Sequence, residues 1–266
     1  MSMRSLAKAY LLRVKSHARS LLTLAIALDV AITVLMVVTG LFLPQIFTPI
    51  TRHALIVLAE KILQVHEVTN RAIEAIVLAV MIPYLSALIA AYAVTAHLLS
   101  IIVRDRLNGV FEILLSISDR RSIVTGLTVF SIIAALISYI PLLTISLLVT
   151  IPMLLMFNMV SLLYYPVHIL LLLIPAVIFS SILSLMLCLL APKLTRLRVG
   201  LLPIQNALSI VGTVPAAIPF LIINIVPTLG PLTVALYTCA ACIIAVSVLL
   251  LIMPYIIKET ELITTE

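Results

Sequence analysis

Long charge-free stretches dominate the chain, and short segments between them collect most of the charged residues. A helix that crosses a bilayer needs about 20 predominantly apolar residues. The charge-free ranges 30–51 and 75–103 are each long enough for one such helix, and 122–192 and 199–257 are each long enough for two. The pattern therefore predicts six transmembrane helices, the first of which extends back over the apolar run from Leu21.

Turn-forming residues divide the two longest stretches, at Asn158–Pro166 and around Pro227, Gly230 and Pro231. The ten-residue alternating segments of a transmembrane β-barrel are missing from the sequence. We therefore expect an all-α membrane protein whose residues 1–266 form a single domain. The spans are predicted at about 21–43, 75–103, 122–150, 166–191, 199–222 and 232–257.

The N-terminal segment 2–20 has a basic face and an apolar face when drawn as a helix. Arg4, Lys8, Lys15 and Arg19 share one side of that helix. This pattern is typical of a helix that lies in the membrane interface with its basic edge at anionic head groups. The simpler alternative is an ordinary charged segment before the first span.

A second two-faced segment follows the first predicted span, at residues 53–74. Glu60, Gln64, Glu67, Arg71 and Glu74 are spaced as one polar helical stripe opposite Leu55, Leu58, Ile62 and Val65. We expect an amphipathic helix on the outer surface, with the polar stripe as its solvated face.

Composition supports the membrane assignment, because 64% of the residues are hydrophobic and only 10% are charged. Soluble domains average roughly 45–50% apolar and about 25% charged residues. This balance excludes a soluble enzyme, a disulfide-stapled secreted domain and a disordered chain. The net charge of +6 is better explained by cytoplasmic loops than by nucleic-acid binding. Three cysteines without a regular framework give no argument for an oxidising compartment.

The basic residues set the orientation. Of the 16 Lys and Arg residues, only Arg52, Lys61 and Arg71 fall on the side that faces away from both termini. The positive-inside rule then predicts a multi-pass protein of the cell membrane with both termini in the cytoplasm.

Motifs of catalysis are missing from the chain. It has no phosphate-binding GxxxxGK[ST] or GxGxxG loop, and no HExxH or GxSxG motif. Its five histidines are scattered without metal-ligand spacing. Cys239 and Cys242 form a CxxC pair inside the last span, where buried cysteines usually act as small hydrophobic residues. We expect neither an enzyme nor a cofactor or metal site.

Asp29 is the one acidic residue within a predicted span, which makes it a candidate intramembrane polar site. It lies one to two turns from the cytoplasmic end, so a structural role with the carboxylate reaching water is the alternative reading.

The cytoplasmic segment 104–121 is the most informative stretch. It begins with Arg104, Asp105 and Arg106, continues through Gly109, and places an apolar triplet directly after Glu112. A charged loop would not require that triplet. The pattern predicts a short helix with a polar and an apolar face, which could insert into a groove on a partner protein.

This segment resembles the signature of type-2 ATP-binding-cassette (ABC) transporter permeases, R-E-x-G-T-x-E-x-L-L-x-x-P-x-S-R-x-x-x-x-G-K. Matching positions are Arg104, Arg106, Gly109, Glu112, Leu114, Leu115, Arg120 or Arg121, and Gly126. Val110, Ser118 and Leu127 depart from the usual threonine, proline and lysine. The six-span plan and the interfacial N-terminal helix are also similar. The proline-rich end of the fifth span looks like the short re-entrant element that such permeases place before the sixth.

The resemblance implies the permease subunit of an exporter, paired with a second copy or a paralogue, with ATP and Mg²⁺ bound by separate ABC ATPase subunits. Gly109 would allow the sharp turn into the helix. A stand-alone secondary transporter or channel and a non-transporting membrane scaffold are the alternatives, and the substrate is not indicated. The residues that the resemblance implies for coupling to the ATPase are Arg104, Asp105, Arg106, Gly109, Glu112, Leu114 and Leu115.

Overall fold

A computed structural model describes residues 49–64, 68–190 and 201–257, with isolated positions between 23 and 34 and residue 262. Apart from those isolated positions, the first predicted span lies outside the described residues. The interfacial helix expected at 2–20 and the candidate polar residue Asp29 also lie outside them.

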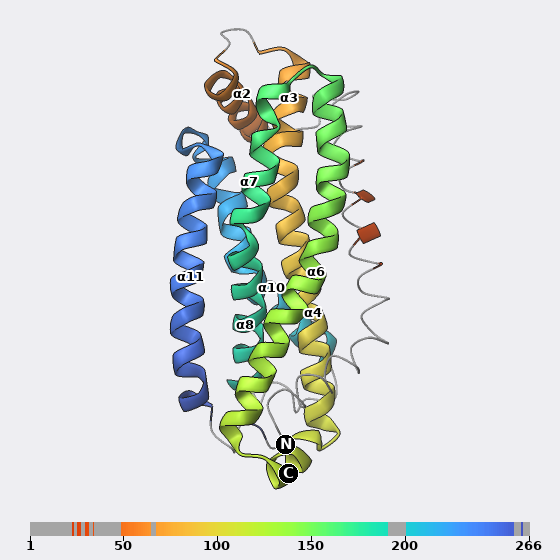
Figure 1. Ribbon diagram of the computed structural model, residues 1–266, viewed down its shortest axis with the longest axis vertical. Coiled ribbons are helices and arrows are strands. Elements are labelled where there is room, and N and C mark those ends of the chain that lie inside the picture. Colours follow the sequence, from red (N-terminus) through yellow and green to blue (C-terminus); the bar gives the residue numbers. More distant parts are fainter. Residues whose placement is uncertain are drawn as a thin grey trace.

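Helices form all of the regular structure in the described residues (Figure 1). Five helical stretches are long and apolar enough to cross a membrane, and they overlap the second to sixth predicted spans. These stretches are Asn70–Arg106, Arg120–Met156, Val160–Leu190, Ala207–Ile225 and Pro231–Ile256. The chain is therefore a helical multi-pass membrane protein.

The elements follow one another with short connections. In chain order they are α2 (Pro49–Leu63), α3 (Asn70–Ile76), the π-helical turn η1 (Val77–Met81), α4 (Ile82–Leu107), α5 (Val110–Ile117), α6 (Arg120–Met156), the 3-10 turn η2 (Val160–Leu162), α7 (Tyr164–Leu172), α8 (Ile174–Leu190), α10 (Leu201–Ile225), the 3-10 turn η3 (Pro227–Leu229) and α11 (Pro231–Ile256).

The long helices run side by side, and α8 lies among them, packed against α4, α6, α10 and α11. The window of α11 that is long enough to span is only 11% buried, so most of this helix faces outward. The short helix α5 lies at one end of the bundle and α2 lies at the other (Figure 1). These ends are called the α5 end and the α2 end below.

Two spans are irregular in the half toward the α2 end. Pro83 has no N–H and its ring would clash with the carbonyl one turn earlier in a regular helix. The π-helical turn η1 precedes it, and the Ile82 N–H donates to the Val77 carbonyl across the wider turn. The second irregularity is the break between α7 and α8 at Leu173, next to Pro175.

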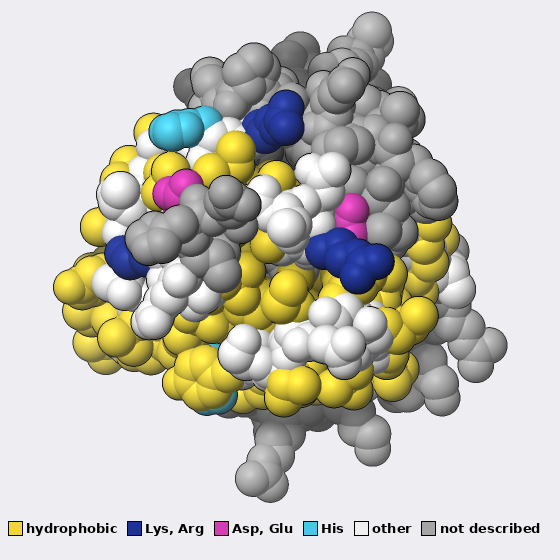
Figure 2. Space-filling model, turned by 90° about the horizontal axis from the view of Figure 1, so that it is seen from above, with side chains coloured by type: hydrophobic (Ala, Val, Ile, Leu, Met, Phe, Trp, Pro, Cys, Tyr) yellow, Lys and Arg dark blue, Asp and Glu magenta, His cyan; other side chains and the backbone are white. Residues whose placement is uncertain are grey.

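The expected outer helix at 53–74 is divided in two. Helix α2 ends at Leu63, Gln64 has a φ of 56°, and α3 begins after the Thr69 N-cap. Leu55 and Leu58 are fully buried, as the apolar stripe predicts. Figure 2 looks onto this end, where charged side chains lie scattered among hydrophobic ones and, at one place, acidic and basic side chains adjoin.

The expectation that Glu74 lies on a solvated face is wrong. Its side chain is only 7% exposed. The residue belongs to α3, which continues into the span, and all residues from Ala72 to Met81 are buried, so the helix is covered on every side from Ala72 onward. Arg71, one turn earlier on the same stripe, is still exposed, so the entry of α3 into the bundle explains the burial of Glu74.

The short re-entrant element expected between the fifth and sixth spans is also not found in the described residues. Helix α10 runs unbroken to Ile225 through Pro215 and Pro219. Neighbouring helices can accommodate prolines inside a transmembrane helix. Only the 3-10 turn η3 then separates α10 from α11.

Candidate coupling site

The turn from α4 into α5 depends on one glycine. Asn108 caps α4, and Gly109 has a φ of 66°, in the left-handed region that L side chains rarely adopt. The Gly109 N–H donates to the Arg106 carbonyl at 3.1 Å. A Cβ at this position would also lie 3.3 Å from Oε2 of Glu112. The sequence-based prediction that Gly109 allows a sharp turn agrees with this backbone.

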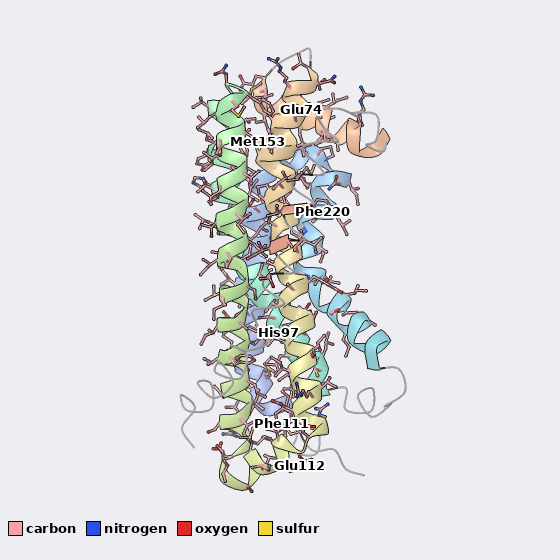
Figure 3. The ribbon with its side chains drawn as sticks, turned by 90° about the vertical axis from the view of Figure 1, so that its right-hand side faces the viewer. Glu74, His97, Phe111, Glu112, Met153 and Phe220 are labelled. Atoms are coloured by element: carbon pink, nitrogen blue, oxygen red, sulfur yellow. The ribbon has the colours of Figure 1, made fainter. Side chains whose placement is uncertain are left out.

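Helix α5 has a buried side and an exposed side. Phe111 and Leu114 point into the bundle and are buried. Ile113 and Ile117 are 63% and 54% exposed, and the Ser116 hydroxyl between them donates to the Ile113 carbonyl. Figure 3 shows Phe111 and Glu112 on successive positions at this end of the bundle. Exposed side chains four residues apart lie on one face of a helix.

Helix α5 ends at Ile117, and α6 begins at Arg120, after its N-cap Asp119. Ser118 is extended, and the Asp119 carboxylate caps α6 by accepting hydrogen bonds from the Ser122 hydroxyl at 2.7 Å and the Ser122 N–H at 3.1 Å. The hydroxyl contact and then the N–H contact lower the pKa of Asp119 from its usual value. This cap fixes the direction in which α6 leaves the α5 end.

Arg106 is directed away from the surface that the resemblance implies. Its side chain is 0% exposed. Nη1 donates to the Cys188 carbonyl at 3.1 Å and Nη2 donates to the Leu189 carbonyl at 3.2 Å, both in the last turn of α8. Backbone carbonyls at helix C-termini carry the negative end of the helix dipole, which suits a guanidinium. Arg106 therefore joins two spans.

The seven residues predicted for coupling are close in the chain but differ in exposure. Asp105, Arg106 and Leu114 are buried, Gly109, Glu112 and Leu115 are half-buried, and Arg104 is exposed. Helical periodicity explains the division between Arg104 and Arg106, because positions two apart point in different directions. Three of the seven side chains therefore lie inside the bundle. The exposed face of α5 is formed by Ile113 and Ile117, which were not among the seven.

Within the spans, hydroxyl-bearing residues of α4, α8 and α10 make close contacts that the sequence pattern does not predict. The Thr95 hydroxyl of α4 lies 3.4 Å from the Ser209 carbonyl of α10. Gly212 lies so close to α8 that a Cβ there would be 1.8 Å from Oγ of Ser184. Small residues allow such close approach of transmembrane helices. The spacing of Ser180 and Ser184, four residues apart in an apolar stretch, is the sequence signal that could have indicated it.

Other chemistry is sparse in the described part of the chain. It contains no group of three or more His, Cys, Asp or Glu residues placed to hold a metal ion. Cys188, Cys239 and Cys242 are free thiols.

Comparisons of the chain with protein-family models, with curated proteins and with solved structures find no match. Functional inference therefore depends on the residues and the geometry.

Proposed function

We propose that the chain is the permease subunit of an ATP-driven exporter of the ABC-2 type. In this proposal two copies, or one copy and a paralogue, form the translocation pathway. Separate ATPase subunits bind ATP and Mg²⁺. The two-sided helix α5, between two spans, is the observation that carries the proposal.

Two properties of α5 and one of the adjoining end of α4 support a docking role. Helix α5 is anchored from inside by Phe111 and Leu114, so a force on it reaches the bundle. Its exposed face presents Ile113 and Ile117 next to charged residues, a combination that fits an apolar groove with a polar rim. Arg104 is exposed on the preceding turn and supplies a charge on that rim.

The same proposal places the α5 end in the cytoplasm, where ATP is available. Arg104, Arg120 and Arg121 are near this end, and the positive-inside rule assigns such clusters to the cytoplasmic side. Arg121 also lies over the ring of Tyr255, with the guanidinium carbon 4.9 Å from the ring centre. Tyrosine and arginine together are typical of a membrane interface.

Transport would follow from different contacts of α5 with the ATPase in its nucleotide-bound and nucleotide-free states. A partner can shift a conformational equilibrium only by the difference of its affinities for the two conformations. In the proposal, closure of the ATPase displaces α5, and the spans attached to it switch access from one side of the membrane to the other.

The test is purification of the full chain from its own membranes, followed by an assay of Mg²⁺-dependent ATP hydrolysis. We expect a protein with a GxxxxGK[ST] loop to co-purify. Ile117→Asp should lower its recovery about tenfold or more, because a charge replaces an apolar contact on the docking face. Val160→Asp, an equally exposed apolar residue at the α2 end, is the matched control.

Glu112→Lys tests the coupling itself. A lysine in the first turn of α5 opposes the helix dipole, so we expect ATP hydrolysis to continue while transport falls. Equal recovery of the ATPase with Ile117→Asp and Val160→Asp, or normal coupled transport by Glu112→Lys, contradicts the proposal. Transport without any ATPase would instead favour a secondary carrier.

A further inference from the structure

Arg106 is the largest fully buried side chain in the described part of the chain, and it joins elements that are far apart in sequence. Its guanidinium reaches the carbonyls of Cys188 and Leu189 at 3.1 and 3.2 Å. Burial of an arginine is unfavourable unless its donors are satisfied. Its presence here therefore indicates a role for this contact that an apolar residue could not fill.

The backbone of the same residue begins the turn into α5. The Arg106 carbonyl accepts the Gly109 N–H at 3.1 Å, and Gly109 is the left-handed residue after which α5 starts. One residue thus holds the start of α5 through its carbonyl and the end of α8 through its side chain.

Helix α8 is well placed to pass a displacement on. It packs against α4, α6, α10 and α11, so four of the described spans touch it. Its contact with α10 includes the close approach of Ser184 to Gly212. A movement of the last turn of α8 therefore reaches most of the bundle.

We propose that Arg106 is the positioning residue that makes α8 follow α5. The proposal rests on the proposed function, because it names the joint through which displacement of α5 enters the spans. Two parallel donors hold both the direction and the distance of the α8 end. Lysine has the same charge but lacks this planar fork, so it replaces Arg106 only in part.

The first test uses the full chain alone, in lipid nanodiscs, and measures hydrogen exchange of the backbone amides of residues 186–190. Arg106→Met should raise their exchange rates about tenfold or more, the change expected for loss of a charge-assisted hydrogen bond. Arg106→Lys should fall between Arg106→Met and the natural chain. Arg104→Met, an exposed arginine on the same helix, should leave these amides within about twofold of the natural chain.

A second measurement distinguishes positioning from a purely structural role. Nitroxide labels at Ser118, the half-buried C-cap of α5, and at Leu187, in a chain whose cysteines are replaced by alanine, report the distance between α5 and α8. In the natural chain this distance should keep one narrow distribution, with and without the ATPase and a non-hydrolysable ATP analogue. In Arg106→Met it should broaden in the chain alone and shift when the ATPase and the analogue are added.

The outcomes separate the two proposals. Unchanged exchange at 186–190 in both Arg106 variants overturns the role of Arg106, whatever the ATPase does. Changed exchange with a label distance that stays narrow in the chain alone makes Arg106 a structural cap and also overturns it. Failure of any ATPase to bind contradicts the proposed function, while exchange and the label distance in the chain alone still decide whether Arg106 holds α8 to α5. If Arg106→Met does not fold, Arg106→Lys supplies both readings.

Discussion

The two ends of the bundle are held together in different ways. At the α5 end, the buried guanidinium of Arg106 ties the start of the α5 turn to α8. At the α2 end, the ties converge on the turn between α10 and α11. Lys61 of α2 donates to the Thr228 carbonyl at 2.5 Å from an exposed position, and the Tyr84 hydroxyl donates to the Pro231 carbonyl at 2.6 Å.

The spans are also less regular in the half toward the α2 end than in the half toward the α5 end. Toward the α2 end, the π-helical turn η1 and the break at Leu173 interrupt regular hydrogen bonding. Tyr139 compensates for the second of these, because its hydroxyl donates to the Leu170 carbonyl at 2.7 Å. Toward the α5 end, α4 and α8 continue without interruption. The two halves thus differ in the regularity of α4 and of the span made by α7 and α8.

The two ends of the bundle are expected to lie on opposite sides of the membrane. In a chain without native cysteines, Ser116→Cys at the α5 end and Glu60→Cys at the α2 end are both exposed positions. We expect a membrane-impermeant thiol reagent to label Glu60→Cys in intact cells and Ser116→Cys only in inverted vesicles. Labelling of both positions from one side would show that the bundle does not span as described.

The close approach of α8 and α10 at Gly212 is expected to be intolerant of added volume. A Cβ in Gly212→Ala would lie 1.8 Å from Ser184 Oγ and 3.3 Å from Thr95 Cγ2, so the Ser184 hydroxyl must rotate away and the contact between α8 and α10 must loosen. We expect a loss of about 1–3 kcal/mol in the free energy of unfolding in detergent. Adding Ser184→Ala should recover part of it, since only the 3.1 Å contact with Ser184 Cβ then remains. Ser184→Ala alone is the control, and full stability of Gly212→Ala would refute the close approach.

The two hydrogen bonds at the α2 end, from Tyr84 and from Lys61, should each contribute less to stability than the contact at Gly212. Each can be removed without the other. Tyr84→Phe removes the hydroxyl that donates to the buried Pro231 carbonyl, and we expect a loss of about 1 kcal/mol. Tyr92→Phe, which changes an exposed tyrosine on the same helix, is the matched control. Lys61→Met removes the exposed contact with Thr228 and should cost less than Tyr84→Phe, because water replaces that hydrogen bond. A larger loss for Lys61→Met would reverse this ranking.

The smallest effect is expected from the cap of α6. Hydrogen bonds from Ser122 lower the pKa of Asp119, so the folded protein favours the ionised carboxylate. The contribution of this cap to stability is complete above the ordinary pKa near 4 and is lost as the pH falls through the lowered value. Asp119→Asn keeps a capping oxygen but does not titrate. The stability difference between the natural chain and Asp119→Asn, measured by thermal unfolding, should therefore shrink as the pH is lowered below 4, and a constant difference would show that the cap does not titrate.

Much of the fold could be predicted because it depends on local pattern. Charge-free length indicated the second to sixth spans, the triplet after Glu112 indicated α5, and Gly109 indicated the turn before it. Each of these signals lies within one element and reflects the length that a bilayer demands or the backbone freedom of glycine.

The remainder could not be predicted, because it depends on contacts between distant segments. The contact of Arg106 with Cys188 joins residues 82 apart, and nothing in the local sequence distinguishes a buried arginine from an exposed one. The burial of Glu74 depends on where α3 enters the bundle, between Arg71 and Ala72, and the spacing of the polar stripe does not indicate that point. The close approach of α10 to α8 at Gly212 depends on which helices are neighbours, and the local sequence does not specify this.

The length of α6 has a consequence for the surrounding lipid. Its 37 residues extend over about 55 Å, whereas the hydrocarbon core of a typical bilayer is about 30 Å thick. From Ser122 to the end of the helix at Met156 it carries no charged side chain that would fix its depth. Hydrophobic mismatch of this size is relieved by tilt or by local thickening of the bilayer, at a cost that depends on acyl-chain length. The thickness of the host membrane therefore sets the tilt of α6 relative to the membrane normal.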